Sequence, residues 1–170
     1  MKRRLAILAL TALAVVALIS VIFTVTSPAL AGGATQISGV GSYAAGGECV
    51  DPEGAGSDFA LKMEGDLEGC HYVFVETFEC SPSGTYRERG TEIFVGEYNG
   101  MDGTFGTTYL FTAKLGDCDD LDTEIWGRCQ HPIVAGSGTD DFEGVTGRFD
   151  IKDDLEAFPV EFPYKGHLRW

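Results

Sequence analysis

Apolar and polar side chains alternate along most of the chain beyond residue 58. The alternation is clearest after Gly144, where Val145, Gly147, Phe149 and Ile151 fall on one face and Thr146, Arg148, Asp150 and Lys152 on the other. A period of two is the pattern of a β-strand with one buried face. This part of the chain is therefore predicted to be built from strands.

Similar runs at 58–68, 70–80, 85–98, 104–115, 123–134 and 160–170 are separated by short links that contain Gly, Asn or Pro. Seven or eight strands with such links predict an all-β fold, a barrel or a sandwich. We favour an antiparallel barrel, because glycines occupy inward positions of several strands and suit a strongly curved wall. These are Gly65, Gly127, Gly147 and Gly166.

The first 31 residues have the three parts of a secretory signal peptide. Three basic residues at 2–4 precede an apolar run over 5–23, and Ala29-Leu30-Ala31 provides a small-x-small cleavage site. We expect cleavage after Ala31 and a secreted, extracellular protein. The alternative is an uncleaved segment that tethers the protein to a membrane, because the apolar run is nearly long enough to span one.

The expected mature chain forms one domain. Residues 32–57 are rich in Gly, Ala and Ser and are predicted to be a flexible entry segment with one possible short strand at 35–43. Residues 58–170 are predicted to form the barrel domain, which is long enough for a hydrophobic core of its own.

The chain is strongly acidic, with 12 basic and 26 acidic residues. Removing the leader leaves 9 basic residues and a net charge of −17. Such a charge repels phosphate backbones and anionic lipid surfaces. We therefore expect no nucleic-acid partner and no membrane partner after signal cleavage. Nothing in the sequence specifies an oligomeric state.

All five cysteines, Cys49, Cys70, Cys80, Cys118 and Cys129, follow the leader, so export would place them where disulfides form. Cys70 and Cys80 flank a single predicted strand about 33 Å long, which a disulfide cannot bridge. The remaining connectivities stay open, with Cys70–Cys129 preferred. One cysteine is left over within the chain.

The segment Gly136-Ser-Gly-Thr-Asp-Asp-Phe-Glu-Gly-Val-Thr-Gly-Arg-Phe149, with the closing Tyr164-Lys-Gly-His-Leu-Arg169, resembles the glycine-rich signature of allene oxide cyclase-like and dirigent-like barrels. The resemblance implies an eight-stranded antiparallel barrel whose lumen opens at one end and holds a small apolar molecule. Asp140 stands where the signature has glycine, and Asp tolerates the left-handed backbone region better than most residues. No catalytic residue of the cyclases matches a position here.

An aromatic set could line an apolar ligand cavity, together with a polar group or two. The candidate ligand-binding residues are Tyr72, Phe74, Phe105, Tyr109, Phe111, His131 and Tyr164, with Phe149 and Trp170 in the wider set. The alternative is a filled interior, since small barrels also pack their centres with such side chains.

Two titratable residues are candidates for acid–base chemistry. His131 falls on the inward face of its strand, and Glu76 stands between Phe74 and Phe78. A histidine in the lumen could act as a general base, and a buried glutamate would have a raised pKa. The simpler interpretations are a hydrogen-bonded core histidine and a solvated strand residue.

No metal or cofactor is expected. Zinc is disfavoured because Cys-x-x-Cys and His-x-x-x-His spacings do not occur. The acidic loop at 117–124 offers carboxylates for calcium, but Leu121 stands where an EF-hand has a ligand and no Gly follows. The sequence also contains no Gly-x-Ser-x-Gly element, phosphate loop or dinucleotide fingerprint.

Two classes of function fit these features. The first is a secreted, non-enzymatic barrel that binds a small apolar ligand or serves as an extracellular interaction module. The second is a cyclase or isomerase that uses groups such as His131 and Glu76 on an apolar substrate in the lumen. Two titratable side chains that meet in one cavity would favour the second class.

Overall fold

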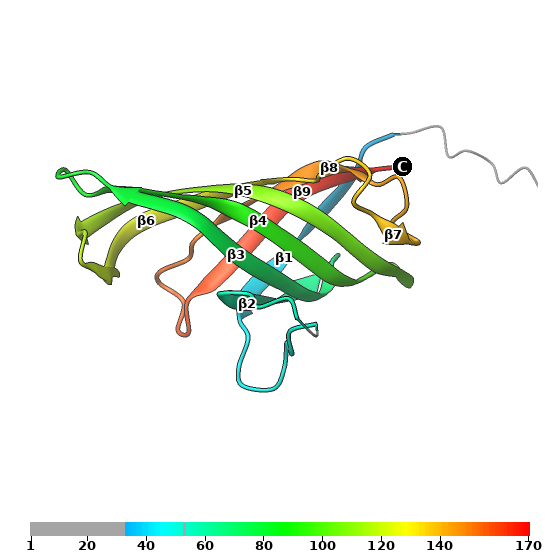
Figure 1. Cartoon of the computed structure of the whole chain (residues 1–170), viewed down its shortest axis with the longest axis horizontal. Coiled ribbons are helices and arrows are strands. Elements are labelled where there is room, and N and C mark those ends of the chain that lie inside the picture. Colours follow the sequence, from blue (N-terminus) through cyan, green and yellow to red (C-terminus); the bar gives the residue numbers. More distant parts are fainter. Residues whose placement is uncertain (1–32, 53) are drawn as a thin grey trace, which may run out of the picture.

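The computed structural model describes residues 33–52 and 54–170, and the regular structure in these ranges is entirely β. The strands are β1 (Thr35–Tyr43), β2 (Phe59–Gly65), β3 (Glu68–Cys80), β4 (Thr85–Tyr98), β5 (Met101–Asp117), β6 (Asp120–Pro132), β7 (Thr139–Asp140), β8 (Thr146–Lys152) and β9 (Glu161–Arg169). Figure 1 shows the strands wound around a common axis.

The sheet closes on itself. Its strands follow the order β4-β3-β2-β1-β9-β8-β6-β5-β7, and a further antiparallel pairing of β4 with β5 completes the ring. Eight strands form the barrel, and the short β7 pairs with β5 near its N-terminal end. The predicted eight-stranded antiparallel barrel is thus confirmed, and closure removes the edges that an open sheet would expose.

The barrel begins earlier than the sequence analysis predicted. β1 pairs with β2 on one side and with β9 on the other, so it is an integral part of the wall. The boundary predicted at residue 58 is therefore too late. The possible short strand at 35–43 is confirmed, and it belongs to the barrel rather than to a flexible entry segment. Gly39 and Gly41 weakened the pattern here, because they occupy inward positions without providing apolar side chains.

One end of the barrel is closed by aromatic packing. Phe142, from the loop after β7, packs edge-on against Phe94 and Phe105, which stack on each other with ring centroids 4.9 Å apart. All three rings are fully buried. Asp140 holds the turn with a φ of 53°, which is the left-handed conformation expected for this position. The glycine-rich segment at 136–149 therefore forms the cap of the barrel.

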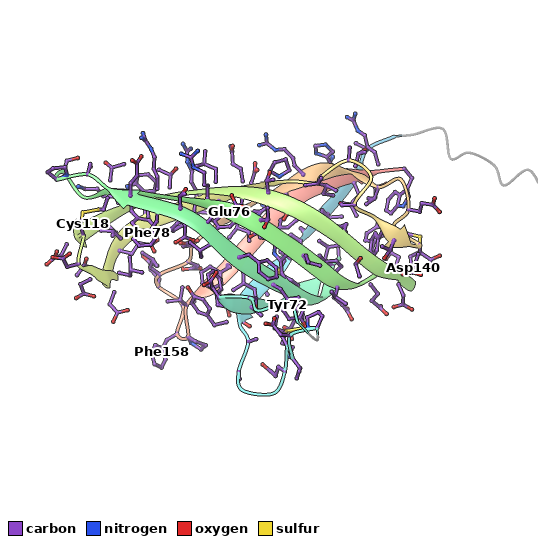
Figure 2. All side chains as sticks on the ribbon, in the orientation of Figure 1. Tyr72, Glu76, Phe78, Cys118, Asp140 and Phe158 are labelled. Atoms are coloured by element: carbon purple, nitrogen blue, oxygen red, sulfur yellow. A yellow bond between two sulfur atoms is a disulfide. The ribbon has the colours of Figure 1, made fainter. Side chains whose placement is uncertain are left out.

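At the other end, the β3–β4 and β5–β6 hairpins extend as long arms (Figure 1). A disulfide between Cys80 and Cys118 joins the two arms near their tips. Figure 2 shows Cys118 at the opposite end of the molecule from Asp140. The arms belong to four consecutive strands, so they lengthen one side of the barrel wall at this end.

The second disulfide joins Cys49 to Cys70 and fastens the loop between β1 and β2 to β3. Cys70 and Cys80 are not paired with each other, as predicted from the length of their strand. The preferred Cys70–Cys129 bridge is wrong, because Cys129 faces inward from β6 and is the buried free cysteine. Cys70 lies on the outer face of β3, so the barrel wall separates the two side chains.

The predicted signal peptide lies outside the described residues. In residues 33–52 and 54–170 there is no helix of the length and hydrophobicity needed to cross a bilayer. The two disulfides are consistent with an extracellular protein.

The disulfide pattern predicts a specific thiol count. Native protein purified without reductant should react hardly at all with a thiol reagent, because Cys129 is buried. Unfolding should expose one thiol, and unfolding with reduction should expose all five. Three or more reactive thiols in unfolded, unreduced protein would contradict the two bridges.

Gly39 provides a test of the tight contact between β1 and β9. A Cβ there would overlap the Glu64 carbonyl oxygen and the Tyr164 ring. Gly39→Ala should lower the free energy of unfolding by about 1–3 kcal/mol, measured by urea denaturation. Gly41→Ala is the matched control on the same strand, because its nearest contact is the flexible Met63 sulfur at 3.2 Å. Equal effects would contradict the packing described.

Candidate functional site

The open end of the barrel contains a cavity of about 460 Å³. None of the three cap rings lines it. The walls are mainly apolar, with aromatic and aliphatic side chains from all eight strands of the barrel. The aromatic lining residues are Tyr43, Phe59, Tyr86, Tyr109, Phe111 and Phe162. This volume is within the usual range for small-molecule sites.

A buried carboxylate, Glu92 of β4, lies at the inner end of this cavity. It is 3% exposed, and its Oε2 atom accepts two hydrogen bonds. The Thr107 hydroxyl donates to this oxygen at 2.6 Å, and His131 Nδ1 donates at 2.7 Å. His71 Nε2 lies 3.4 Å from the same oxygen and 3.3 Å from Thr107 Oγ1. Two strands thus supply donors to one buried charge, and His71 of a third strand hydrogen-bonds Thr107, one of these donors.

These contacts determine the protonation of the cluster. Burial raises the pKa of Glu92, but the charges of His71 and His131 and the hydrogen bonds from His131 and Thr107 outweigh it and lower that pKa to about 2. Burial lowers the pKa of His71 to about 4, against the attraction of Glu92. Glu92 is therefore ionised and His71 is neutral at physiological pH.

The His131 ring is oriented by its hydrogen bond to Glu92 and by stacking on Phe149. Its Nδ1 must carry a proton, because an ionised carboxylate only accepts hydrogen bonds. The ring stacks on Phe149 with centroids 4.7 Å apart and planes 6° from parallel. Its Nε2 is buried without a hydrogen-bond partner, and the residue lines the cavity. In the neutral ring this nitrogen is an acceptor available to a ligand.

Further carboxylates line the cavity nearer its mouth. Glu88 accepts hydrogen bonds from the hydroxyls of Tyr86 and Tyr109, at 2.6 and 2.8 Å. Burial and the hydrogen bond to Glu88 raise the pKa of both tyrosines, so both hydroxyls stay protonated as donors. Glu88 thereby holds two aromatic rings in fixed orientations on the cavity wall.

Glu124 of β6 and Asp153, just after β8, face each other across Gly127. Burial and the neighbouring Asp153 carboxyl raise the pKa of Glu124 to about 8, and burial also raises the pKa of Asp153. The two carboxyls therefore share a proton near neutral pH. Gly127 makes this pair possible, because a Cβ at that position would overlap both carboxylates.

The buried cluster also has the residue types of a transition-metal site. His71, Glu92 and His131 each place one potential ligand atom within 4.8 Å of the others. Metal-bound histidines usually donate their second ring nitrogen to a carboxylate or carbonyl. Here His71 Nδ1 and His131 Nε2 have no such partner. The arrangement fits a hydrogen-bonded cluster around Glu92 better than a metal centre.

Some of the predicted ligand-binding residues face the lumen. Tyr109, Phe111 and His131 line the cavity. Phe105 lies in the packed cap, and Tyr164 is buried beside Gly39, where its hydroxyl accepts a hydrogen bond from the Leu67 amide at 2.8 Å. The interior is thus filled by packed side chains at one end of the barrel and contains an open cavity at the other.

Three other candidates lie on the outside of the barrel. Tyr72 faces outward under the loop between β1 and β2 and donates a hydrogen bond to the Val50 carbonyl at 2.9 Å. Phe74 shares this outer face. Glu76 is exposed at a bulge of β3 (Figure 2), which is the simpler of its two interpretations, a solvated strand residue, and it does not meet His131 in the cavity. The inward face of β3 instead carries His71 and Val73.

The residues that sequence reasoning missed are His71, Glu88 and Glu92. A signal for the two glutamates was present, because they alternate in phase with Tyr86, Phe94 and Tyr98 along β4. β3 carries apolar residues on both faces, and a period of two could not decide which face is inward. Pairing with β2 and β4 fixes that choice in the structure.

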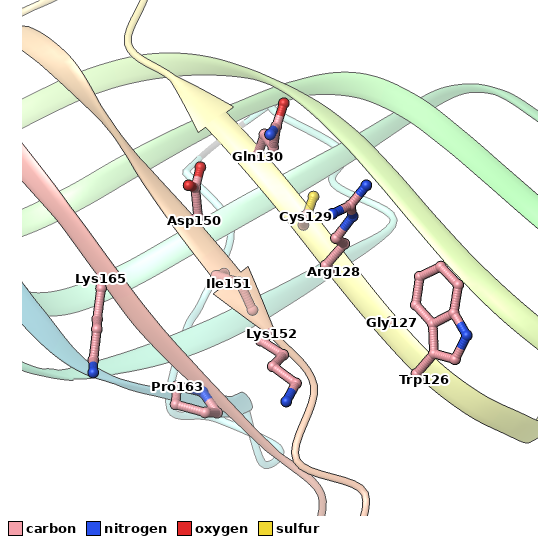
Figure 3. A pocket seen from close by; sticks show the side chains of 10 residues that line it. All are labelled: Trp126, Gly127, Arg128, Cys129, Gln130, Asp150, Ile151, Lys152, Pro163 and Lys165. Atoms are coloured by element: carbon pink, nitrogen blue, oxygen red, sulfur yellow. The ribbon is translucent and has the colours of Figure 1, made fainter.

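A second concavity, of about 670 Å³, lies on the outer wall across β6, β8 and β9 (Figure 3). Its side chains include Arg128, Lys152 and Lys165, all of which are exposed. Trp126 marks one end. This groove is separated from the Glu92 cluster by the wall of the barrel.

Comparison with known proteins finds no matching family model, no similar curated protein and no similar solved structure. The site is therefore interpreted from its own geometry.

The low pKa of His71 predicts an acid-sensitive fold. Unfolding returns His71 to its ordinary value of 6.5, so between about pH 6.5 and 4 the unfolded chain binds a proton that the folded protein does not. The free energy of unfolding should fall through this window, with a His71 contribution of up to about 3 kcal/mol.

Urea denaturation at several pH values between 7 and 4 tests this contribution. His71→Gln keeps a donor for Glu92 but cannot titrate. Its free energy of unfolding should fall less steeply with acidification than that of the wild type. Parallel curves for the two proteins would show that His71 protonates as easily in the folded state as in the unfolded chain.

Proposed function

We propose that this chain is an exported β-barrel that binds a small, mainly apolar molecule in its lumen. The observation that carries the proposal is the cavity of about 460 Å³, with aromatic walls and the Glu92–His131 pair at its inner end. Apolar walls provide affinity through burial, and a few fixed polar groups orient the ligand.

The polar end of the cavity is suited to hold a ligand in one orientation. Glu92 fixes the His131 ring, and Phe149 supports it from behind. A group that donates a hydrogen bond to His131 Nε2 would satisfy a buried acceptor that otherwise has no partner. Because an unsatisfied buried polar atom costs about 1–3 kcal/mol, such a ligand would gain affinity at this position.

Export is part of the proposal. The signal-peptide pattern at residues 1–31 and the two disulfides support a secreted protein. The resemblance to allene oxide cyclase-like and dirigent-like barrels supports a lumenal site, although it specifies no ligand. An extracellular interaction module is the competing interpretation, and it would not need an open lumen.

A second candidate function is a cyclase or isomerase that acts on an apolar substrate in the same lumen. One observation favours it: His131 lines the cavity, its Nδ1 is held by a buried carboxylate and its Nε2 has no partner, which is the arrangement of an oriented general base. Binding requires fewer groups and remains the first proposal. Conversion of a bound molecule into an isomer, lost in His131→Asn, would favour the enzyme.

Binding of a neutral apolar dye tests the lumenal site. N-phenyl-1-naphthylamine should become strongly fluorescent with the wild-type protein. The double variant Val73→Trp/Ile151→Trp places two indoles on the cavity wall and should bind the dye at least about tenfold more weakly. Circular dichroism should show that the variant keeps its β structure.

Ile93→Trp is the control, because it adds an indole to the outer face of β4, where Ile93 is 38% exposed. It should bind the dye as the wild type does. Equal dye binding by all three proteins would place the dye outside the lumen. Absence of binding to the wild type would contradict the proposal.

A further inference from the structure

The charges that line the cavity all have one sign. Five carboxyl groups line it, those of Glu88, Glu92, Asp122, Glu124 and Asp153, of which the last two share a proton. Among the described lining residues there is no Lys or Arg to neutralise them. The cations of this part of the chain lie elsewhere, as on the outer groove across β6, β8 and β9. The lumen therefore has a negative potential that low-dielectric walls strengthen.

Hydrogen-bond acceptors also outnumber free donors in the cavity. Carboxylate oxygens and His131 Nε2 are acceptors. The hydroxyls of Tyr86 and Tyr109 both donate to Glu88, which leaves Tyr43 as the lining hydroxyl with a free donor. His131 Nε2 is buried without a partner, and the Glu124–Asp153 pair presents further carboxyl oxygens. A ligand that supplies several N–H donors would satisfy these acceptors.

The aromatic walls complete the pattern. Tyr109 lies parallel to His131 within 24°, with ring centroids 6.4 Å apart, and Phe111 continues the same wall along β5. Aromatic faces attract both flat apolar rings and cations. A site that combines such faces with carboxylates discriminates against anions, because a second negative charge would be repelled by every charged group around it.

We infer that the ligand class of the lumen is a protonated organic amine attached to a flat apolar group. The ammonium contacts the carboxylates and His131 Nε2, and the apolar part lies between the aromatic walls. This inference rests on the proposed lumenal binding function and specifies its ligand. It requires no catalytic step.

Three indole ligands of similar size separate charge from shape. Tryptamine carries an ammonium at about pH 8, tryptophol a neutral hydroxyl and indole-3-propionate a carboxylate. Isothermal titration calorimetry and displacement of N-phenyl-1-naphthylamine would measure their affinities for the wild-type chain. We expect tryptamine to bind at least about tenfold more tightly than tryptophol, with indole-3-propionate the weakest.

Glu88→Gln removes one charge from the cavity wall. It should weaken tryptamine binding by about tenfold relative to tryptophol binding, because only the ammonium loses an oppositely charged partner. Glu76→Gln is the matched control, since it removes the same charge from the exposed outer face of β3. It should leave tryptamine binding unchanged. Equal losses in both variants would show that only the net charge of the protein matters, which would overturn the inference.

The possible failures are distinguishable. If the dye binds in the lumen but tryptamine binds no better than tryptophol, the amine inference is wrong and the binding proposal stands. If indole-3-propionate binds most tightly, the inference is likewise overturned. If neither the dye nor any indole binds, the lumenal binding function itself fails.

Discussion

The buried charge of Glu92 is the constraint on which the polar interior of this barrel depends. A carboxylate removed from water is strongly destabilising unless several donors surround it. Here one carboxylate oxygen accepts hydrogen bonds from the Thr107 hydroxyl and from His131 Nδ1, and His71 lies beside them. These residues belong to β3, β4, β5 and β6, so the charge links four neighbouring strands. Orientation of His131 toward the cavity follows from this requirement.

The two ends of the lumen serve different purposes. At one end Phe142 packs edge-on against the stacked rings of Phe94 and Phe105, and the glycine-rich turn that carries it forms the cap. At the other end the long hairpin arms, joined by Cys80–Cys118, extend the wall beyond the short strands. Closure at one end and extension at the other leave a single deep cavity above the Glu92 cluster.

Strand periodicity was sufficient to predict the barrel, because closed antiparallel sheets keep a strict alternation. It correctly placed His131 and Tyr109 inside. Strand periodicity failed for β3, because Tyr72 and Val73 are both large hydrophobic residues on opposite faces of the strand. Tyr72 is covered on the outside by the loop that the Cys49–Cys70 disulfide fastens to β3.

Glu92 was overlooked for a related reason. An acidic residue on a strand is normally taken to face solvent, and the two donors of Glu92 come from residues 15 and 39 positions away, with His71 21 positions away. Such long-range partners are created by the fold and leave no local pattern. Disulfide connectivity has the same property, since the inward or outward direction of each cysteine decides which of them can meet.

The protonation of the His131 ring tests the account most directly, because both the Glu92 constraint and the acceptor character of the lumen depend on it. A long-range proton–nitrogen NMR spectrum of the imidazoles at about pH 8 reports which nitrogen carries the proton. We expect the Nδ1–H tautomer for His131, with an Nε2 resonance that shifts when tryptamine is added. A proton on Nε2, or an Nε2 resonance unaffected by a bound ligand, would contradict the account.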